Sequence, residues 1–283
     1  MHRIFCSTGA LIGMPNGRDY RLLSGCADHL QCDGYEFMMY ESWYPEWREL
    51  TRFLISLPLR FPTMHCEKSV GEKLSSGDRD ERQRALADFR INCQIAKEIG
   101  AVKMVLHLWN GKPSDQRIEN HLAAYGDFKE EAICQGIELT VENVVCTARE
   151  PLTHFRSLLR LDPEARFTWD TKLAAFHGLT DALYAPENGW LREHIAHLHI
   201  NDYDGSYASW GHLKTLHVGQ GSIDFAHLFA FLPKMNYQGD YTVEATAFLP
   251  DGVIHWQDLN HTFAAIRSYL SMNQGEEAHG RQG

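Results

Sequence analysis

The sequence lacks several features that would each define a class of protein. Its seven cysteines are scattered and form no CxxC pair, which argues against zinc-finger spacing and against a disulfide framework and favours reduced thiols in a cytoplasm. No apolar run reaches the roughly 18 residues needed to span a bilayer. The N-terminal MHRIFCSTGALIGMPNG has no long uncharged segment of the signal-peptide kind. The sequence therefore predicts a soluble cytoplasmic protein with no membrane partner.

An excess of positive charge is also absent. Asp and Glu outnumber Lys and Arg by 37 to 27, which gives a formal net charge of −10. This balance favours no broad attraction to phosphate backbones, so nucleic acid is not expected as a partner. No GxGxxG follows the first apolar segment, which argues against an open sheet that binds a dinucleotide.

Short apolar segments alternate with segments of helical period from one end of the chain to the other. Several are nearly continuous apolar runs, as is typical of parallel strands covered on both faces. The eight strands predicted in this way are Ile4–Ser7, Gly34–Met39, Thr63–Cys66, Lys103–Leu108, Glu138–Glu142, Phe167–Asp170, Ile195–Ile200 and Tyr241–Ala245. Eight strand–helix units are the number that closes a barrel, which typically needs about 250 residues. We therefore expect an α/β fold, a single-domain (β/α)8 TIM barrel over residues 1–272, and a disordered tail over residues 273–283.

The clearest helical segment is Asp78–Ile99. Apolar side chains recur along it at spacings of three and four, namely Leu86, Phe89, Cys93 and Ala96. Asp78 and Glu81 are placed to cap its first turn, and Gly100 is placed to end it. Pro151 is placed to open a later helix, because proline is tolerated in the first turn.

Acidic residues and histidines stand at the C-terminal ends of the later strands. In order along the chain they are His107, Glu142, Asp170, His199 and Glu244, with spacings of 35, 28, 29 and 45 residues. Each spacing is about one strand–helix unit or slightly more, so these side chains are predicted to converge at the barrel mouth. Barrel enzymes place their catalytic groups at that rim.

Three carboxylates and an imidazole gathered at one place would repel one another unless a cation neutralised them. Carboxylate and imidazole ligands suit Mn²⁺, Zn²⁺, Co²⁺ or Fe²⁺ better than they suit soft metals. A single acidic residue at a strand end is more often a helix N-cap or an ion-pair partner. Four ligand-type residues in consecutive strand-end positions favour a divalent metal site.

A series of short motifs lies along the chain in a characteristic order. They are HCEKSVGEKLSSGD (His65–Asp78), AKEIGAVKMVLH (Ala96–His107), GIELTVEN (Gly136–Asn143), WDT (Trp169–Thr171), HLHIND (His197–Asp202), GQGSIDF (Gly219–Phe225) and YTVEAT (Tyr241–Thr246). From about residue 34 to 248 the chain resembles the xylose isomerase-like barrel superfamily of sugar-phosphate isomerases and epimerases, which also includes endonuclease IV. The resemblance implies four metal ligands, which map onto Glu142, Asp170, His199 and Glu244. It also implies that His65 and His107 line the same pocket.

Departures from the superfamily's nuclease pattern bear on the number of metal ions. The trinuclear nuclease carries a histidine three residues after the aspartate of the sixth strand, where this chain has Leu173. It also carries an Asp-x-His pair after the seventh strand, where this chain has Leu213, Lys214 and Thr215. We therefore expect one divalent ion (Mn²⁺, Zn²⁺, Co²⁺ or Mg²⁺), and we do not expect DNA repair activity.

Relatives with one metal interconvert aldoses and ketoses or epimerise ketoses. The resemblance thus implies a metal-dependent isomerase or epimerase in carbohydrate metabolism, acting on a sugar or polyol ketone. A metal bound to carbonyl and hydroxyl oxygens acidifies the adjacent C–H and stabilises the enediolate. Glu142 and Glu244 are then expected to abstract and return the proton. Two alternatives stay open: a lyase of the keto-inositol dehydratase type, and a noncatalytic sugar-binding barrel.

Three further residues are expected to contact the substrate. Lys172 follows the sixth strand and is a candidate electrophile or proton shuttle, although such a lysine more often begins a solvated loop. Glu36, in the second strand, is placed to hydrogen-bond substrate or to pair with a basic group. Trp109 lies in a loop at the mouth, as do Trp43, Trp47 and Trp210, and aromatic rings there either stack on a sugar or close the barrel top.

Other residues are weaker candidates for supporting roles. Arg18, Lys112 and the loop Gly219–Ser222 are candidates to receive a phosphate, because loops after the last strands of a barrel often do so. Asn201 and Asp202 are placed either to orient the metal ligands or to cap their own loop. Barrels of this type often pair into dimers or tetramers, so a homo-oligomer is an open expectation.

Overall fold

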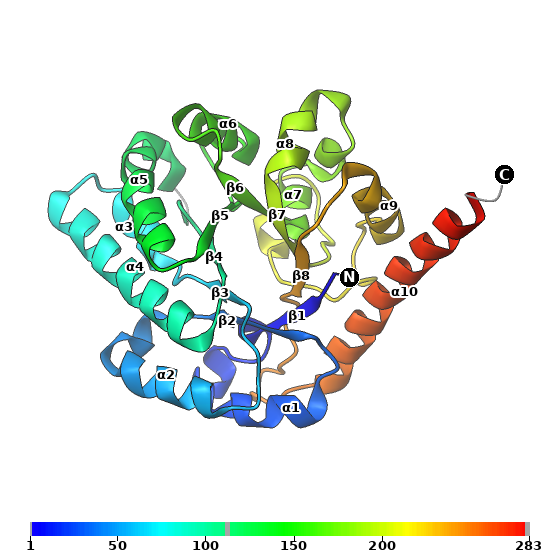
Figure 1. Ribbon diagram of the computed structural model, residues 1–283, viewed down its shortest axis with the longest axis horizontal. Helices are drawn as coiled ribbons and strands as arrows, with labels where there is room; N and C mark the ends of the chain where they lie inside the picture. Colours follow the sequence, from blue (N-terminus) through cyan, green and yellow to red (C-terminus); the bar gives the residue numbers. More distant parts are fainter. Residues whose placement is uncertain (1, 111–113, 281–283) are drawn as a thin grey trace.

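The strands close into a parallel barrel. A computed structural model describes the backbone of residues 2–110 and 114–280, and the side chains of these ranges as far as Met272. Eight strands pair in chain order from β1 to β8, and β1 also pairs with β8, where Phe5 stands opposite Thr242. The strands are β1 (Ile4–Ser7), β2 (Gly34–Met38), β3 (Thr63–His65), β4 (Lys103–Leu106), β5 (Glu138–Glu142), β6 (Arg166–Asp170), β7 (Ile195–Ile200) and β8 (Asp240–Val243). Figure 1 shows them in the middle of the molecule with the helices around them. The predicted (β/α)8 barrel is confirmed.

Helices follow the strands and form the outer layer of the barrel. The α-helices of the described ranges are α1 (Cys26–His29), α2 (Trp47–Ser56), α3 (Ser69–Leu74), α4 (Arg79–Ile99), α5 (Ile118–Cys134), α6 (Pro151–Leu161), α7 (Thr171–Phe176), α8 (Gly189–His194), α9 (Phe225–Phe231) and α10 (Trp256–Gly280). Short 3-10 segments occupy several loops: η1 (Thr8–Ala10), η2 (Met14–Asn16), η3 (Tyr20–Gly25), η4 (Glu41–Glu46), η5 (Ser114–Arg117), η6 (Thr180–Leu183), η7 (Pro186–Asn188), η8 (Trp210–His212) and η9 (Leu232–Met235). None of the described helices is long and apolar enough to cross a membrane.

The predicted strands are all present, and their limits differ by a few residues at most. The apolar pattern placed the ends of β4 and β8 two residues too late. Leu108 and Ala245 are buried although they lie beyond the sheet, so apolar character extends further than strand pairing. Helix α10 reaches Gly280 and so includes most of residues 273–283, whose composition predicts disorder. The boundary between barrel and tail stays a prediction.

The longest internal helix, α4, begins and ends as its sequence predicts. The Asp78 carboxylate accepts the backbone N–H groups of Asp80 and Glu81 at 2.8 and 3.0 Å and so satisfies two donors of the first turn. Gly100 ends the helix with φ +82°, a left-handed conformation that glycine adopts without steric cost. Pro151 occupies the first turn of α6. Local chemistry thus sets the limits of these helices.

The interior of the barrel is polar, whereas the layer between barrel and helices is apolar. In the outer layer, Phe155 of α6 stacks on Phe167 of β6 with ring centroids 3.8 Å apart. Inside the barrel, the hydroxyl groups of Thr140 and Thr168 lie 2.7 Å apart. The interior also holds Glu36, whose side chain is fully buried. The barrel interior therefore contains polar and ionisable side chains below the mouth.

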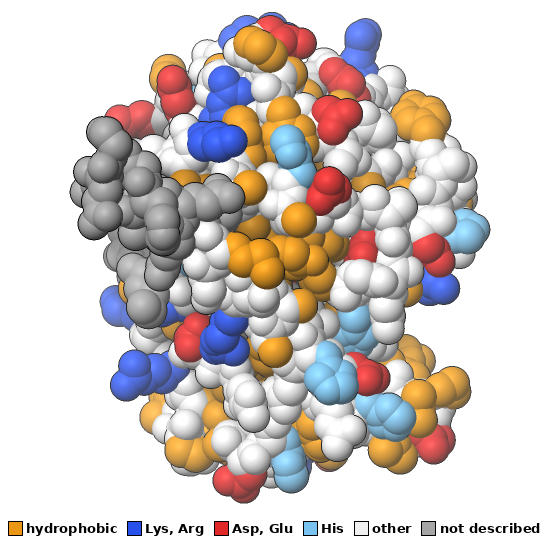
Figure 2. Space-filling view, turned by 90° about the vertical axis from the view of Figure 1, so that its right-hand side faces the viewer, with side chains coloured by type: hydrophobic (Ala, Val, Ile, Leu, Met, Phe, Trp, Pro, Cys, Tyr) orange, Lys and Arg blue, Asp and Glu red, His pale blue; other side chains and the backbone are white. Residues whose placement is uncertain are grey.

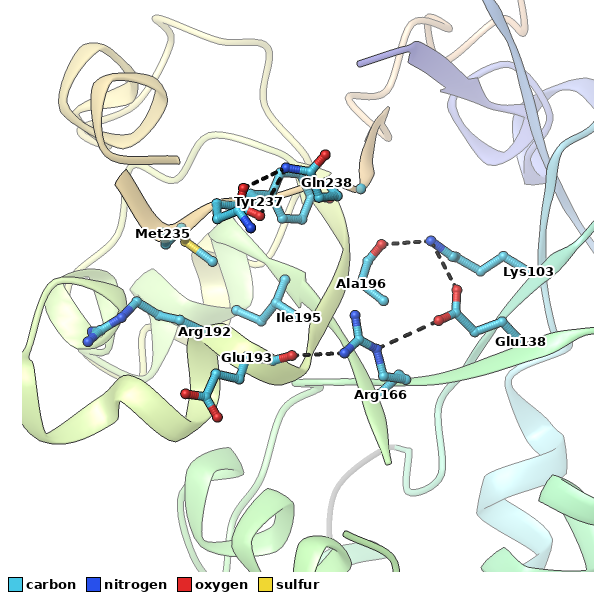
Figure 3. A pocket seen from close by; sticks show the side chains of 12 residues that line it. Lys103, Glu138, Arg166, Arg192, Glu193, Ile195, Ala196, Met235, Tyr237 and Gln238 are labelled. Carbon is cyan, nitrogen blue, oxygen red and sulfur yellow. Dashed lines mark hydrogen bonds and ion pairs between the residues drawn. The ribbon is translucent and has the colours of Figure 1, made fainter. Parts of the chain in front are cut away.

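The N-terminal end of the barrel carries a cavity of about 510 Å³, shown in Figure 3. Its cations already have partners: Lys103 donates to the carbonyl of Ala196 at 2.6 Å and lies 3.4 Å from Glu138. Arg166 donates to the carbonyl of Glu193 at 2.8 Å. Residues at this end of a barrel serve stability rather than catalysis. We therefore attribute to this cavity no function beyond stability.

The surface shows no broad area of one charge on the face that carries α9 and α10. Figure 2 views this face, the right-hand side of Figure 1, and shows basic and acidic side chains interspersed around an apolar area. The excess of acidic side chains in this chain is therefore not concentrated on this face.

A substitution at Gly71 of α3 would test how tightly this helix packs against the segment that follows β4. A Cβ at this position would overlap the carbonyl oxygen of His107, just beyond β4. Gly71→Ala is therefore expected to lower the free energy of unfolding by about 1–3 kcal/mol, the usual effect of overpacking. The matched control is Gly126→Ala on the exposed face of α5, where nothing lies within 4 Å. It is expected to stabilise by about 0.5–1 kcal/mol. Urea titration measures both, and equal midpoints for the two variants would contradict the packing.

Candidate metal centre

Four side chains meet at the C-terminal mouth of the barrel, as the sequence predicts. Glu142 ends β5, Asp170 ends β6, His199 lies near the end of β7, and Glu244 follows β8. One ligand-type atom from each lies within 4.8 Å of the others. The first three side chains are buried, and Glu244 is partly buried. Parallel strands bring their C-terminal ends to one rim, so residues far apart in sequence become neighbours.

The His199 imidazole is at the centre of the cluster and is fully buried. Its Nδ1 atom lies 2.8 Å from Glu142 Oε1 and 3.5 Å from Glu244 Oε2. Its Nε2 atom points the other way and lies 3.2 Å from Glu36 Oε1. Burial alone would lower the pKa of this imidazole, but the three surrounding carboxylates raise it well above its ordinary value. The ring is thus held between carboxylates on both edges.

Asp170 has two functions, because each carboxylate oxygen has a different partner. Oδ1 accepts the backbone N–H of Leu173 at 2.6 Å and caps α7. Oδ2 accepts from the amide of Asn201 at 2.7 Å and faces the cluster. Burial, with neighbouring carboxylates, raises the pKa of Asp170 to about 7, although Lys172 opposes the shift. The ordinary N-cap role and the site role therefore coexist in one side chain.

Asn201 connects two of the carboxylates. Its Nδ2 group donates to Asp170 Oδ2 at 2.7 Å and to Glu244 Oε2 at 3.0 Å. This arrangement matches the expectation that Asn201 orients the cluster. Asp202 does something else: its carboxylate accepts the backbone N–H groups of Gly219 and Gly221, both at 2.9 Å. Asp202 therefore anchors a loop.

The expectation that the loop Gly219–Ser222 receives a phosphate is wrong, because its backbone N–H groups already have acceptors. The N–H groups of Gly219 and Gly221 are taken by Asp202, that of Gln220 by the carbonyl of His217, and that of Ser222 by the carbonyl of Tyr203. With all four donors engaged, the loop has no backbone N–H left for an anion. Lys112, another phosphate candidate, lies outside the described residues.

His65 and His107 stand beside Glu142 Oε2, the oxygen that does not face His199, and the His65 ring also stacks on the His199 ring with centroids 6.0 Å apart. His107 Nε2 is 2.5 Å from Glu142 Oε2, and His65 Nε2 is 3.5 Å from the same oxygen. The two imidazoles are 3.2 Å apart through their Nε2 atoms. Burial lowers the pKa of His107 to about 4, against the attraction of Glu142. His107 also lines a cavity, whereas His65 is fully buried behind it.

Two adjoining cavities lie over the cluster. The inner cavity, about 210 Å³, is lined by the three carboxylates of the cluster and by His107. The outer cavity, about 500 Å³, extends toward the loops after β1, β2 and β3. Lys68, Asn110, Lys172 and Glu244 line both, so the two spaces share a wall. Lys172 therefore lies where a substrate-contacting residue was expected.

Three of the expected substrate contacts line neither cavity, namely His65, Glu36 and Trp109. His65 is fully buried behind His107, so the expectation that it lines the same pocket is not met. Trp109 is fully buried, packs against the ring of His154 at 5.0 Å between centroids, and lines neither cavity. Its ring also contacts Phe155 of α6, so it packs between the barrel and that helix and does not face the mouth. Glu36 also lines neither cavity, since its carboxylate points at His199 and His197 inside the barrel. Among the other tryptophans, Trp43 is buried and Trp210 lines the inner cavity.

Sequence reasoning missed Lys68 and Asn110, which line both cavities. Lys68 follows the third strand by three residues, within the HCEKSVGE motif. This position after a strand end would have allowed its location at the mouth to be predicted. Asn110 lies three residues after His107, and its Oδ1 atom is 3.1 Å from His107 Nδ1. Short polar residues just beyond a strand give no distinctive pattern, which is why Asn110 was not found.

The donor set fits a hard divalent cation. Three carboxylates are held together, yet within the described ranges none of them forms an ion pair with a lysine or arginine. Their polar neighbours in the described residues are imidazoles, one amide and a backbone N–H. Buried carboxylates at this density require a counter-charge. Oxygen ligands with one imidazole suit Mn²⁺, Zn²⁺, Co²⁺ or Mg²⁺.

The fold is a closed parallel barrel, and its C-terminal mouth carries an acidic cluster with one histidine. These two features place the protein in the class of (β/α)8 barrels with a candidate metal site at the rim. Residues 27–260 match the family described as xylose isomerase-like TIM barrel, and the chain belongs to this family.

Solved structures of similar fold include a D-tagatose 3-epimerase-like protein, with a TM-score of 0.70, 16% sequence identity, and coverage of 97% of this chain and 99% of that one. Another is the IOLI protein with a bound zinc atom, with a TM-score of 0.69, 12% identity, and coverage of 96% and 99%. At these identities the similarity shows the fold. Over 51 residues the chain is 37% identical to a Haemophilus influenzae protein named as an L-ribulose-5-phosphate 3-epimerase, and the match spans 18% of each chain.

Proposed function

We propose that this protein is a divalent-metal-dependent epimerase or isomerase of a sugar or polyol ketone. The observation that carries the proposal is the cluster of Glu142, Asp170, His199 and Glu244, whose three carboxylates line the inner cavity. Membership of the xylose isomerase-like family supports it. Relatives named as ketose 3-epimerases, and one with a bound zinc atom, agree with both parts of the proposal.

The four cluster residues would hold the metal ion. A bound divalent cation supplies Lewis-acid chemistry: it polarises a carbonyl and stabilises the negative charge that develops on its oxygen. Asn201 and the N-cap contact of Asp170 keep two of the carboxylates in place before substrate binds. Such support restricts the ligands to one geometry, as preorganised sites require.

Glu142 and Glu244 would exchange the proton at the carbon next to the carbonyl. They come from β5 and from the segment after β8, and they approach His199 Nδ1 separately, at 2.8 and 3.5 Å. Two carboxylates on different sides of a bound ketone can remove a proton from one face and return one to the other. His107, 2.5 Å from Glu142 Oε2, would exchange a proton with that carboxylate.

Lys172 would act on the substrate oxygen. Its side chain is nine-tenths buried, and it lines the inner cavity beside Asp170. A buried ammonium is a strong partner for a developing oxyanion, because the surroundings exclude competing water. Lys172 therefore adds a fixed positive charge at the place where the enediolate would form.

Hydrogen exchange tests the proposal directly. The purified protein is analysed for metals and then incubated in D2O with a panel of ketoses and inosose-type compounds, and deuterium incorporation is followed by NMR. We expect about one divalent ion per chain and incorporation at a carbon adjacent to the carbonyl of at least one compound. A chelator is expected to abolish incorporation, and added metal to restore it. Bound metal with no exchange on any compound would favour a sugar-binding barrel, and loss of water would favour a dehydratase.

A further inference from the structure

The loop that follows β5 forms part of the wall of the inner cavity but contains no helix or strand of its own. It comprises residues 143–150, between the end of β5 and the start of α6. Val144 and Val145 of this loop line the cavity. Because no regular hydrogen-bond ladder holds such a segment, its backbone groups must find partners elsewhere. The position of this wall therefore depends on contacts between the loop and other segments.

The end of the loop next to β5 is bound to β6 and α7. The Asn143 side chain donates to the carbonyl of Asp170 at 3.0 Å and accepts the N–H of the same residue at 2.6 Å. Further along the loop, the N–H of Cys146 donates to Nε2 of His177, the residue after α7, at 3.1 Å. These contacts fix the first half of the loop.

The far end of the loop is bound by one buried carboxylate, that of Asp115 in η5. Its Oδ1 accepts the N–H and the hydroxyl of Thr147 at 2.8 and 2.9 Å. Its Oδ2 accepts the N–H groups of Ala148 and Arg149 at 2.8 and 3.2 Å and lies 3.2 Å from His154 Nε2. Burial alone would raise the pKa of Asp115, but these donors lower it below its ordinary value. A charged carboxylate thus binds three consecutive N–H groups of the loop.

Ser114, the neighbour of Asp115, holds a second part of the cavity wall. Its hydroxyl accepts the N–H of Asn110 at 2.8 Å, and Asn110 lines both cavities. Its carbonyl lies 3.0 Å from His121 Nε2, and Nδ1 of the same ring lies 2.7 Å from the carbonyl of Leu108. Ser114 and Asp115 therefore bind two segments of the inner wall, although neither residue lines a cavity itself.

The surroundings of Asp115 are not arranged for a metal ion. Asp115, Cys146 and His154 do offer ligand-type atoms within 4.8 Å of one another. Both carboxylate oxygens, however, already accept at least two hydrogen bonds, and Cys146 Sγ lies 3.3 Å from the carbonyl of Val144, to which it donates. A carboxylate whose lone pairs are all engaged has none left for a cation. Asp115 is thus an anchor for the backbone.

We infer that Asp115 is a positioning residue of the proposed epimerase, which fixes the Val144–Val145 wall of the inner cavity through the N–H groups of residues 147–149. The inference rests on the proposed function. Within the described ranges Asp115 makes no hydrogen bond or ion pair with the four cluster residues, so it acts through the loop. Hydrogen bonds to a charged group are the stronger kind, and a misplacement of about 1 Å at a binding site costs up to about 10²-fold in rate.

Asp115→Asn tests this role. The amide keeps one acceptor oxygen but turns an N–H donor toward the loop N–H groups, which releases part of the loop. We expect kcat/KM for the best ketose of the panel to fall by about 10- to 100-fold. The loss is expected mainly in KM, because Glu142 keeps its pairing within β5. Deuterium exchange at several ketose concentrations measures both constants, and metal titration in parallel is expected to show unchanged affinity.

Asp162→Asn is the matched control. The Asp162 carboxylate also anchors a loop, since it accepts the Tyr125 hydroxyl and the N–H of Glu164, both at 3.1 Å. It precedes β6, at the other end of the barrel. We expect this variant to lower the free energy of unfolding and to leave kcat and KM unchanged. Thr147→Val removes only the hydroxyl donor to Asp115 and serves if Asp115→Asn does not fold. Its KM is expected to rise less, by at most about tenfold, the net contribution of one hydrogen bond.

The outcomes separate the inference from the proposed function. Lower stability with unchanged kcat and KM in Asp115→Asn and Thr147→Val would overturn the inference while leaving the epimerase proposal standing. A loss of metal affinity in step with activity would also overturn it. Wild-type protein without deuterium exchange would instead refute the proposed function, and binding of the same ketoses to the metal-loaded protein is then measured by calorimetry. Weaker binding in Asp115→Asn than in Asp162→Asn would sustain the positioning role, and no binding to any variant would overturn it.

Discussion

Glu142→Gln is expected to lower kcat by about 10²- to 10⁴-fold, the contribution of a positioned general base. The amide keeps the size of the side chain but accepts no proton, and it weakens the set of oxygens around His199. Glu244→Gln is expected to have an effect of similar size, because the two carboxylates serve opposite directions of the same proton exchange. Rates are measured as deuterium incorporation into the best ketose of the panel.

The controls separate the loss of a base from the loss of the fold or the ion. Glu138 lies at the other end of β5, 3.4 Å from Lys103, so Glu138→Gln changes the same strand far from the mouth. We expect it to retain activity. Elemental analysis of each variant shows whether the metal content has fallen along with the rate. Full activity in Glu142→Gln would refute the assigned role of this carboxylate.

Glu36→Gln is expected to weaken metal affinity by about 10- to 100-fold, the usual effect of altering a group that supports a ligand. Glu36 is fully buried, and both its oxygens lie close to His199 Nε2, at 3.2 and 3.3 Å. A carboxylate there holds the proton on Nε2 and leaves the Nδ1 lone pair free to face Glu142 and Glu244. Glu36 is thus a positioning residue: it acts through His199.

Metal titration followed by competition with a chelator measures this effect, and the free energy of unfolding of the metal-free protein is measured in parallel. The control is Thr140→Val, which removes the 2.7 Å contact with Thr168 inside the barrel but touches no cluster residue. Both variants are expected to change stability, but only Glu36→Gln is expected to change metal affinity. Unchanged affinity in Glu36→Gln would reduce this residue to a structural role.

Much of the architecture was predictable because it depends on local patterns. Apolar runs of strand length recur at regular intervals, and Ile4–Ser7, Glu138–Glu142 and Ile195–Ile200 have the predicted bounds. Helix limits followed from single side chains such as Asp78, whose carboxylate can satisfy only nearby N–H groups. Strand ends were less accurate, since a residue such as Leu108 is buried by packing outside the sheet.

The convergence of the cluster was predictable as well, because topology brings equivalent strand ends to one rim. Directions of side chains were not. Glu36 and Lys172 both carry charge and both lie near the mouth in sequence terms, yet only Lys172 lines a cavity. Trp109 was expected at the surface of the pocket and is buried beneath it. Glu36 lies two residues before the end of β2 and points at His197 and His199 inside the barrel, whereas Lys172 lies in the first turn of α7, beyond the end of β6.

The sequence by itself determined the barrel, the family resemblance and the set of four ligand-type residues, because each depends on order and spacing along the chain. Only the tertiary structure decided which groups support that set and which face the ligand. The N–H groups of the loop Gly219–Ser222 are occupied by Asp202 and by the carbonyls of His217 and Tyr203, whereas Arg18 and Lys68 line a cavity and form no ion pair within the described residues. Such distinctions depend on contacts between segments far apart in the chain, and no local pattern records them.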